Sequence, residues 1–185
     1  MSGSFDPVRA NLEWIARDYA SILVTARAGE LDLPTNGTRW TNRQLLFHML
    51  LGQRITWMVI GVMGVFARLP PSASRAWASG MAATTPLYHR LNWLGGVLGG
   101  RLFTLPRMRR QMDALTARIL DFYDQAAPAD LARGMTIPPS WDPYFTDSMD
   151  RTGLLAWAPQ HYQHHRRQLT LSTLPNTEPP HLFDV

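Results

Sequence analysis

Residues 160–169 read Gln-His-Tyr-Gln-His-His-Arg-Arg-Gln-Leu, and this stretch decides the fold. Its histidines His161 and His165 stand four positions apart, so on an α-helix they project from the same face, one turn from each other. That spacing lets both imidazoles reach one metal ion. A third histidine, His48, lies in an equally apolar, helix-like stretch at residues 41–50. We therefore predict that His48, His161 and His165 meet in the core of a helical bundle and hold a divalent metal through three nitrogens.

The helical wheel of this last segment separates a buried face from a wet one. With His161 at the origin and about 100° per residue, five side chains fall within about 40° of it. They are Leu154, Trp157, His165, Gln168 and Ser172. Gln163, Arg166 and Arg167 fall on the opposite side of the wheel. His164 lies about 60° from the origin, which makes it a poorer ligand and a candidate surface or supporting residue.

The composition limits what kind of site this is. At 185 residues the chain is one domain, large enough to bury a core without disulfides or structural zinc. It has no cysteine, which excludes disulfides, zinc fingers, iron–sulfur ligation and a thiol nucleophile of its own. All 18 basic residues are arginine, so a Schiff-base lysine is excluded as well. Histidine is then the expected metal ligand.

The charge and hydropathy patterns argue against nucleic acid and membrane as partners. The formal charge is +4 and the pI is about 10.1, yet the arginines are scattered along the whole chain. Residues 1–7 lack a basic region followed by an apolar run, so we predict no signal peptide and a cytoplasmic protein. The most apolar segment, residues 57–67, is about half the roughly 20 residues that a membrane span needs, and we expect a buried helix end there.

Capping residues and helical periodicity predict the first half of the fold. A first helix should cover about residues 7–28, with Asp6 as its N-cap. Thr41 and Gln44 have the form of a capping box and open a second helix over residues 42–66. His48 lies on the apolar face of this second helix.

The region from residue 69 to 103 is rich in proline and glycine but too apolar for a free linker. We expect a long crossover with one or two short helices, packed over an end of the bundle. Either it is a lid over a site or it is a packed connection, and glycine-rich loops are more often the second.

The second half should contain two further helices. Thr104 opens a third helix, which Pro128 stops. An ordered loop over residues 128–146 follows. Asp147 or Ser148 is expected to cap the last helix, which carries the histidine pair and should end near residue 173.

These features together resemble the DinB-like superfamily of four-helix metalloproteins, which includes thiol-dependent isomerases and transferases. The resemblance rests on residues 40–50, on Trp141-Asp142-Pro143-Tyr144-Phe145 and on residues 161–169, in that order along the chain. It implies an all-α, up-down-down-up four-helix bundle over residues 1–185, with a long crossover between the second and third helices and an irregular tail from about residue 174. It also implies the metal triad His48, His161 and His165. Pro159, which removes an amide donor and should bend the last helix, and the enlarged crossover depart from the family pattern.

Each candidate residue also has a purely structural interpretation. The three histidines would form a hydrogen-bonded polar cluster if no metal were bound. Gln168 either orients a ligand or bonds a backbone group. Asp142 either fixes a histidine tautomer or only forms the turn before Pro143. Neither Glu13 nor Glu30 has a defined facing, so no general base is assigned.

Three neutral imidazoles would leave coordination positions for water or substrate, which is typical of catalytic sites. A bound ion would lower the pKa of water toward about 7 for hydrolysis, or bind and ionise a thiol for transfer or isomerisation. Since the chain has no cysteine, that thiol would be a low-molecular-weight cofactor, and the family resemblance implies mycothiol, bacillithiol or glutathione. Zinc or nickel is the expected ion, with iron and manganese as alternatives, because all four accept imidazole.

Two functions therefore stay open. The first is a metal-dependent enzyme that acts on a small electrophilic substrate by thiol-dependent transfer, isomerisation or hydrolysis. The second is a non-catalytic, stress-associated or ligand-binding helical bundle that uses the apolar crossover as an interaction surface. Exposed apolar faces also predict a homodimer.

Overall fold

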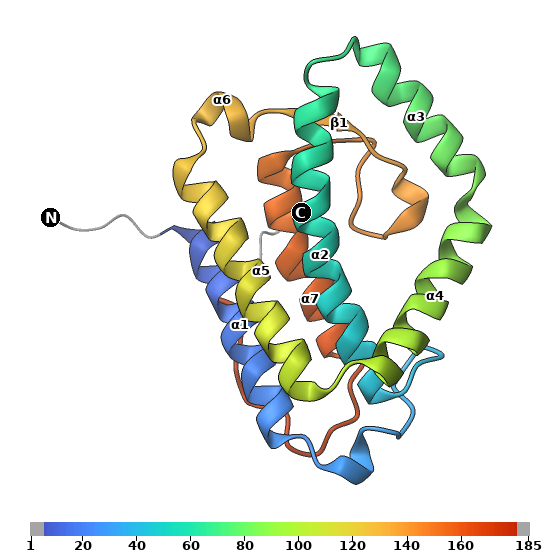
Figure 1. Cartoon of the computed structure of the whole chain (residues 1–185), viewed down its shortest axis with the longest axis vertical. Helices are drawn as coiled ribbons and strands as arrows, with labels where there is room; N and C mark the ends of the chain where they lie inside the picture. Colours follow the sequence, from blue (N-terminus) through green and yellow to red (C-terminus); the bar gives the residue numbers. More distant parts are fainter. Residues whose placement is uncertain (1–5, 181–185) are drawn as a thin grey trace, which may run out of the picture.

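The computed structural model describes residues 6–180, which form seven α-helices and a two-stranded antiparallel sheet (Figure 1). The helices are α1 (Pro7–Thr25), α2 (Asn42–Phe66), α3 (Pro71–Ala83), α4 (Thr85–Leu102), α5 (Leu105–Gln125), α6 (Pro128–Leu131) and α7 (Arg151–Arg166). The strands are β1 (Gly134–Thr136) and β2 (Ser148–Asp150), and short 3-10 helices cover Ala28–Glu30 and Pro139–Trp141. The mostly helical fold class was predicted; the small sheet was not.

The predicted caps of the first two helices are confirmed. A carboxylate oxygen of Asp6 accepts the backbone N–H groups of Val8 and Arg9 at 3.1 and 3.2 Å. The side-chain oxygen of Gln44 accepts the backbone N–H of Thr41 at 3.2 Å, which is half of a capping box. Helix α1 ends three residues earlier than predicted, because a 3-10 turn begins at Ala28.

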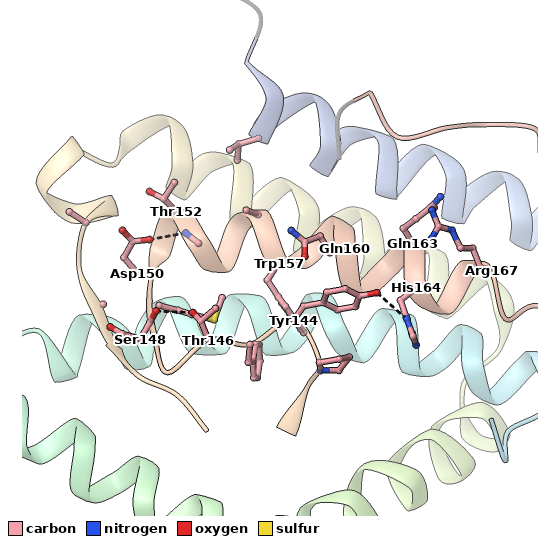
Figure 2. Close-up of a pocket in the computed structure, with 18 residues that line it drawn as sticks. Tyr144, Thr146, Ser148, Asp150, Thr152, Trp157, Gln160, Gln163, His164 and Arg167 are labelled. Atoms are coloured by element: carbon pink, nitrogen blue, oxygen red, sulfur yellow. Dashed lines mark hydrogen bonds between the residues drawn. The ribbon is translucent and has the colours of Figure 1, made fainter. Parts of the chain in front are cut away.

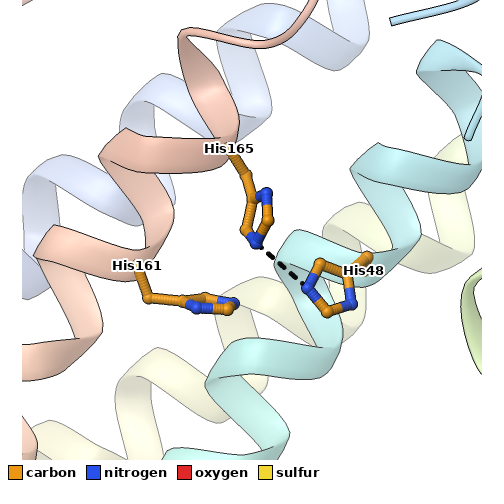
Figure 3. A group of neighbouring side chains, drawn as sticks. All are labelled: His48, His161 and His165. Carbon is orange, nitrogen blue, oxygen red and sulfur yellow. Dashed lines mark hydrogen bonds between the residues drawn. The ribbon is translucent and has the colours of Figure 1, made fainter. Parts of the chain in front are cut away.

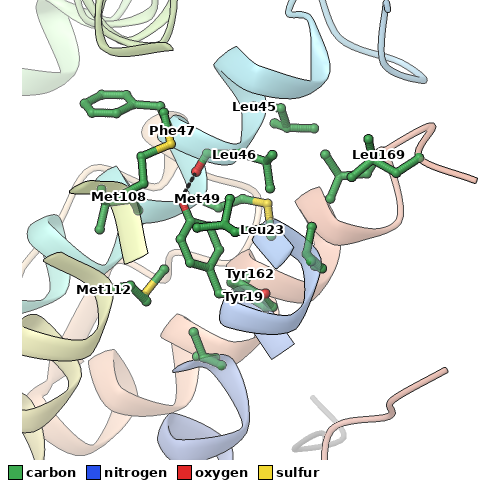
Figure 4. Packing of buried hydrophobic residues seen from close by; sticks show 14 of the residues in the cluster. Tyr19, Leu23, Leu45, Leu46, Phe47, Met49, Met108, Met112, Tyr162 and Leu169 are labelled. Atoms are coloured by element: carbon green, nitrogen blue, oxygen red, sulfur yellow. Dashed lines mark hydrogen bonds between the residues drawn. The ribbon is translucent and has the colours of Figure 1, made fainter. Parts of the chain in front are cut away.

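Four helices, α1, α2, α5 and α7, pack around a shared core. Helix α1 contacts α5 and α7, and α2 contacts the same two helices (Figure 1). The four helices therefore form a closed ring in which α5 and α7 each lie between α1 and α2. Figure 4 shows the core near the start of α2, where Tyr19 of α1 and Met112 of α5 point inward among apolar neighbours. The hydroxyl of Tyr19 donates to the carbonyl oxygen of Leu46 at 2.8 Å, which satisfies the one polar group that this buried ring carries.

Helices α1 and α7 are also joined by a buried ion pair. The carboxylate of Asp18, a residue that is 1% exposed, accepts the guanidinium of Arg166 at 2.8 and 3.0 Å and the hydroxyl of Tyr162 at 2.9 Å. Each acceptor is thus used, as a buried charge requires. The contact fixes α7 against α1 at the end of α7 that holds His165.

The crossover has the predicted extent and consists of two helices, α3 and α4. The last turns of α4 pack against the start of α2, while α3 and the first turns of α4 diverge from α2 (Figure 1). Glycines allow this approach: a Cβ on Gly99 would lie 2.0 Å from the ring of Phe47, and one on Gly100 would lie 2.8 Å from the Cα of Gln44. Helix α4 is therefore held close to the segment of α2 that carries His48.

The last helix begins later and ends earlier than the sequence indicated. Asp150 caps α7 by accepting the N–H of Gly153 at 2.7 Å, whereas Asp147 and Ser148, the predicted caps, lie before it. The helix ends at Arg166 and not near residue 173, because Thr170 turns away to bond the side chain of Asn42. Residues 174–180 have no regular structure, and the rest of the predicted tail, 181–185, lies outside the described residues.

Within the described part of the chain, one helix, α2, is long and apolar enough by length and composition to cross a membrane. This is also the helix that carries His48 and contacts α4, α5 and α7. Residues 57–67 were predicted to be a buried helix end; they form the end of α2, but only Ile60 and Met63 among them are buried, while Met58 and Val65 are 62% and 58% exposed, so the prediction is wrong for the outer face. The signal-peptide prediction rests on residues 1–5, which lie outside the described residues.

Candidate metal centre

Three histidines from two helices converge between α2 and α7. His48 lies on α2, His161 and His165 lie one turn apart on α7, and one ring nitrogen of each lies within 4.8 Å of the other two (Figure 3). The Nε2 atoms of His48 and His165 are 3.1 Å apart. His48 is 3% exposed and His161 is 7% exposed. The structure thus brings together the three residues that the sequence singled out, while metal binding itself stays a prediction.

Small and aromatic residues position the rings. A Cβ on Gly52 would lie 2.8 Å from Cδ2 and 3.0 Å from Nε2 of His161, so only glycine at this position of α2 leaves room for that imidazole. Trp40 stacks on His48 with ring centroids 4.4 Å apart, and Trp157 lies against His161 at 4.6 Å. The ring of His48 is therefore held by Trp40, and the ring of His161 is held between Trp157 and the backbone at Gly52.

Hydrogen bonds on the outer nitrogens set the tautomers of two ligands. Nδ1 of His161 faces an oxygen of Asp142 at 2.9 Å, and Nδ1 of His165 faces the side-chain oxygen of Gln168 at 2.8 Å. Both oxygens are acceptors, so each Nδ1 carries the proton and each Nε2 directs a lone pair toward the centre. This arrangement is typical of metal-bound histidines.

Asp142 serves both purposes that were considered for it. One carboxylate oxygen holds His161, while the other accepts the indole N–H of Trp157 at 3.0 Å and the backbone N–H of Tyr144 at 2.9 Å. Burial raises the pKa of Asp142, but the hydrogen bond and charge of His161 and the other donors outweigh it, and the net pKa is lowered. Asp142 is therefore an ionised acceptor of three hydrogen bonds, rather than a free general base.

The electrostatic environment keeps the inner histidines neutral. Burial lowers the pKa of His48 well below its ordinary value, and the imidazoles of His161 and His165 lower it further. Burial, followed by His161, lowers the pKa of His165 to about 3. Both rings are thus neutral at physiological pH and offer lone pairs without first losing a proton.

The residues present fit a divalent cation. Nε2 of His161 and Nδ1 of His48 are buried, and neither has a hydrogen-bond partner within residues 6–180. A buried lone pair without a donor is costly, and a cation bound by the three rings would satisfy that of His161. Zinc, nickel, iron and manganese all accept imidazole, and a set of three nitrogens without a carboxylate favours zinc or nickel over manganese.

A hydrogen-bonded chain leads outward from His165. Gln168 bonds His165 through its oxygen and approaches Nε2 of His164 with its amide nitrogen at 3.3 Å, and Nδ1 of His164 meets the hydroxyl of Tyr144 at 3.1 Å. Tyr144 and His164 lie in a wide surface groove of about 1130 Å³ along α7 (Figure 2). His164 is accordingly a supporting residue that reaches His165 only through Gln168, in agreement with its position on the helical wheel.

A second, smaller cavity of about 140 Å³ adjoins the three histidines. Two residues of α4, Tyr88 and Asn92, line it together with Trp141. The sequence interpretation gave Tyr88 and Asn92 no role at the site. The signal that could have identified them is their spacing of four, which puts both on one face of α4, about 100° around the helix from the row of leucines that begins at Leu87 and Leu91.

Other acidic candidates lie elsewhere. Glu13 forms ion pairs with Arg9 and Arg17 on the outer face of α1. Glu30 bonds Ser172 near the end of the described chain. Asp142 is the one acidic residue that lines the smaller cavity.

The comparisons with known proteins agree with this geometry. A family model described as the DinB superfamily matches residues 11–169, which include all three histidines, Asp142 and Gln168. No curated protein and no solved structure matches the chain significantly.

Proposed function

The chain belongs to the DinB superfamily, and from the geometry of its site we propose that it is a metal-dependent enzyme acting on a small electrophilic substrate with the help of a low-molecular-weight thiol. The observation that carries the proposal is the convergence of three imidazoles, of which His161 and His165 have their outer nitrogens held by Asp142 and Gln168. Zinc or nickel is the proposed ion, with iron and manganese as alternatives. Bound there, the ion would act as a Lewis acid that lowers the pKa of a coordinated thiol or water.

Thiol chemistry is favoured over hydrolysis by the state of Asp142. Hydrolysis generally profits from a base that accepts a proton from water. Asp142 is the one carboxylate on the cavity, and its oxygens are occupied by His161, Trp157 and Tyr144. Thiol transfer or isomerisation makes less demand on such a base, because coordination itself ionises a thiol. Glutathione, mycothiol and bacillithiol are the candidate cofactors.

Metal analysis of the untagged protein, purified without added metal, tests the first half of the proposal. We expect close to one equivalent of a divalent ion per chain and its loss in His48→Ala. Less than about half an equivalent, with no difference between the two proteins, would exclude the metal centre. The second half is tested by incubating the loaded enzyme with each thiol and a generic electrophile, with His48→Ala as the control for uncatalysed addition.

The alternative is a non-catalytic bundle that acts through its surface, and one observation favours it. Helix α4 exposes a row of leucines with heptad-like spacing, Leu87, Leu91, Leu94 and Leu98, which are between 41% and 58% exposed. Such a row is self-complementary, so its proposed occupant is a second copy of the chain in a homodimer. Sedimentation of the wild type and of Leu91→Gln/Leu98→Gln tests this: a monomeric wild type would rule the dimer out.

We further propose that α1, α2, α5 and α7 form the up-down-down-up bundle of the family, with α3 and α4 as its crossover. We also propose that the protein is cytoplasmic. The proposal of location rests on the scattered arginines and on the packing of α2 against three other helices. Cell fractionation with an antibody against the native chain tests it.

A further inference from the structure

The cavity beside the three histidines is walled mainly by flat aromatic rings. Trp40, Trp141, Trp157 and Phe145 line it, and Tyr88 lies flat on Trp141 with ring centroids 4.1 Å apart and planes inclined by 4°. Rings packed in this way present faces and edges that attract another π-system more than a saturated group of equal size. The wall chemistry therefore favours a planar occupant.

The size of the cavity limits this occupant to about one ring. Its volume is about 140 Å³, and an apolar cavity of about 150 Å³ in another protein holds a single benzene molecule. Ordinary pockets for cofactors and drug-sized ligands are about 300 Å³ or larger. A two-ring compound or a nucleotide is thus too large to enter fully.

Helix α4 adds two polar groups that the protein does not use. The hydroxyl of Tyr88 and the amide of Asn92 line the cavity, and neither has a hydrogen bond within residues 6–180. Burial, and to a smaller extent the charge of Asp142, raise the pKa of Tyr88 to about 12, so its hydroxyl keeps its proton and acts as a donor at neutral pH. The amide of Asn92 supplies two further donor hydrogens. Two donors one helical turn apart can receive one oxygen acceptor.

We propose that this cavity selects a planar ligand of single-ring size that carries an oxygen acceptor, and that Tyr88 and Asn92 recognise this oxygen beside the three histidines. This inference names the substrate class of the proposed enzyme. It rests on the proposed function only in one respect, namely that a metal ion is bound by the three histidines beside the cavity. Tyr88 and Asn92 are then specificity-determining residues contributed by the crossover helix.

The first test compares benzoate with cyclohexanecarboxylate. The two anions carry the same carboxylate and the same number of ring carbons, and differ in whether the ring is planar. Titrated into the full chain loaded with cobalt(II), and followed by the visible spectrum of the ion, benzoate should bind about fivefold more tightly. Equal affinities, or tighter binding of the puckered ring, would overturn the selection of a planar ligand.

The second test removes the two donors. Tyr88→Phe and Asn92→Leu should each weaken benzoate binding by about tenfold, the effect of losing one buried hydrogen bond. Azide, which needs only the ion, should bind both variants as it binds the wild type, and this control shows that the centre and the fold are intact. Benzoate affinities unchanged in both variants would overturn the role of the pair.

A third measurement separates this inference from the proposed function. If the chain binds no cobalt, the metal centre fails, but the cavity is still tested by ligand-observed NMR on the metal-free protein with the same two anions and the same two variants. Preference for benzoate that depends on Tyr88 and Asn92 supports the inference there too. If neither the cobalt-loaded nor the metal-free protein prefers benzoate to cyclohexanecarboxylate, the inference is wrong.

Discussion

At the scale of single residues, Asp142 is the side chain on which the orientation of His161 depends. Asp142→Asn keeps an oxygen in place but removes the charge that supports the imidazole. We expect metal affinity to fall by about tenfold, the lower end of the effect of such supporting partners. Competition with a chromogenic chelator measures it. Asp147→Asn, an exposed neighbour in the same loop, is the matched control, and equal affinities in the two variants would show that Asp142 serves only the turn.

Gly52 gives a second prediction at this scale, because it acts by absence of a side chain. In Gly52→Ala the new methyl would lie 2.8 Å from His161, so the ring must move away from the centre, and we expect metal affinity to fall by at least about tenfold. Gly61→Ala, on the same helix with nothing within 4 Å of the added Cβ, should bind metal normally. It should also be stabilised toward urea by up to about 1 kcal/mol, since alanine is the better helix former. Wild-type affinity in Gly52→Ala would mean that the ring position is not set by this contact.

The residues of the centre divide into those that the sequence could predict and those that it could not. Helical spacing was sufficient for His161 and His165, because they lie on one helix and local geometry fixes their relation, whereas Gln168 lies in the turn just after that helix and its role was left open. For Asp142 the sequence offered two roles, forming a turn before Pro143 and bonding a histidine. It could not decide between them, since both require the same carboxylate. Gly52 stands four positions after His48, on the same face of α2, but the need for glycine there comes from the ring of His161 on α7, about a hundred residues away.

At the scale of elements, the glycines of α4 decide how closely the crossover approaches α2. In Gly99→Ala the added Cβ would lie 2.0 Å from the ring of Phe47, so α4 must move outward or Phe47 must leave its place. We expect the free energy of unfolding to fall by about 1–3 kcal/mol, as for other overpacked interiors. Urea denaturation measures it, and Gly80→Ala on α3, with open space around it, should not be destabilised. Equal stability of the two variants would contradict this account of the helix pair.

Element boundaries were predictable where a local cap decides them and not where distant contacts do. Asp6 and Thr41 fix the starts of α1 and α2 through bonds to residues within the first turn. The end of α7 depends instead on Asn42, which receives the N–H of Thr170 from the other end of the chain. Strand β2 likewise exists only because β1 lies beside it, and no short-range pattern in residues 134–150 distinguished it from a loop.

At the scale of the whole molecule, buried tyrosines predict how the fold responds to alkali. Burial raises the pKa of Tyr19 and Tyr162, and it raises that of Tyr88 to about 12. Below about pH 9 the phenols are protonated in both the folded and the unfolded chain, so they do not make stability depend on pH. Between about pH 9 and 12 the unfolded chain ionises first, and the free energy of unfolding must fall as pH rises.

The composition makes this titration unusually easy to interpret, because the chain has no lysine and no cysteine. Tyrosine side chains are then the groups expected to ionise in that interval. Urea denaturation at pH 8, 10 and 11, together with phenolate absorbance at 295 nm, should show stability falling from pH 8 to pH 10 and further at pH 11, as absorbance rises. Tyr88→Phe should lessen the fall. Stability that is the same at pH 8 and 11 would contradict the burial of these rings.

The all-helical character, the core face of α2 and the pairing of early and late histidines followed from periodicity alone. The place of α4 did not, because an amphipathic helix bounded by glycines can pack on several faces of a bundle with similar burial. Its contact with α2 depends on which bulky side chain meets which gap, as Phe47 meets Gly99, and such complementarity is a property of the assembled interior.

The nitrogens of His48 and His165 that face each other are separated by 117 positions in the chain. A growing polypeptide that has produced α1 to α5 therefore offers an ion just one of the three rings, and one imidazole holds a divalent cation weakly. If the centre binds metal as proposed, loading comes after nearly all of the chain has been synthesised and arranged. The ion then stabilises a bundle that has already folded and does not guide its assembly. The interior must therefore be able to fold through its apolar contacts, its hydrogen bonds and the Asp18–Arg166 pair, without the ion.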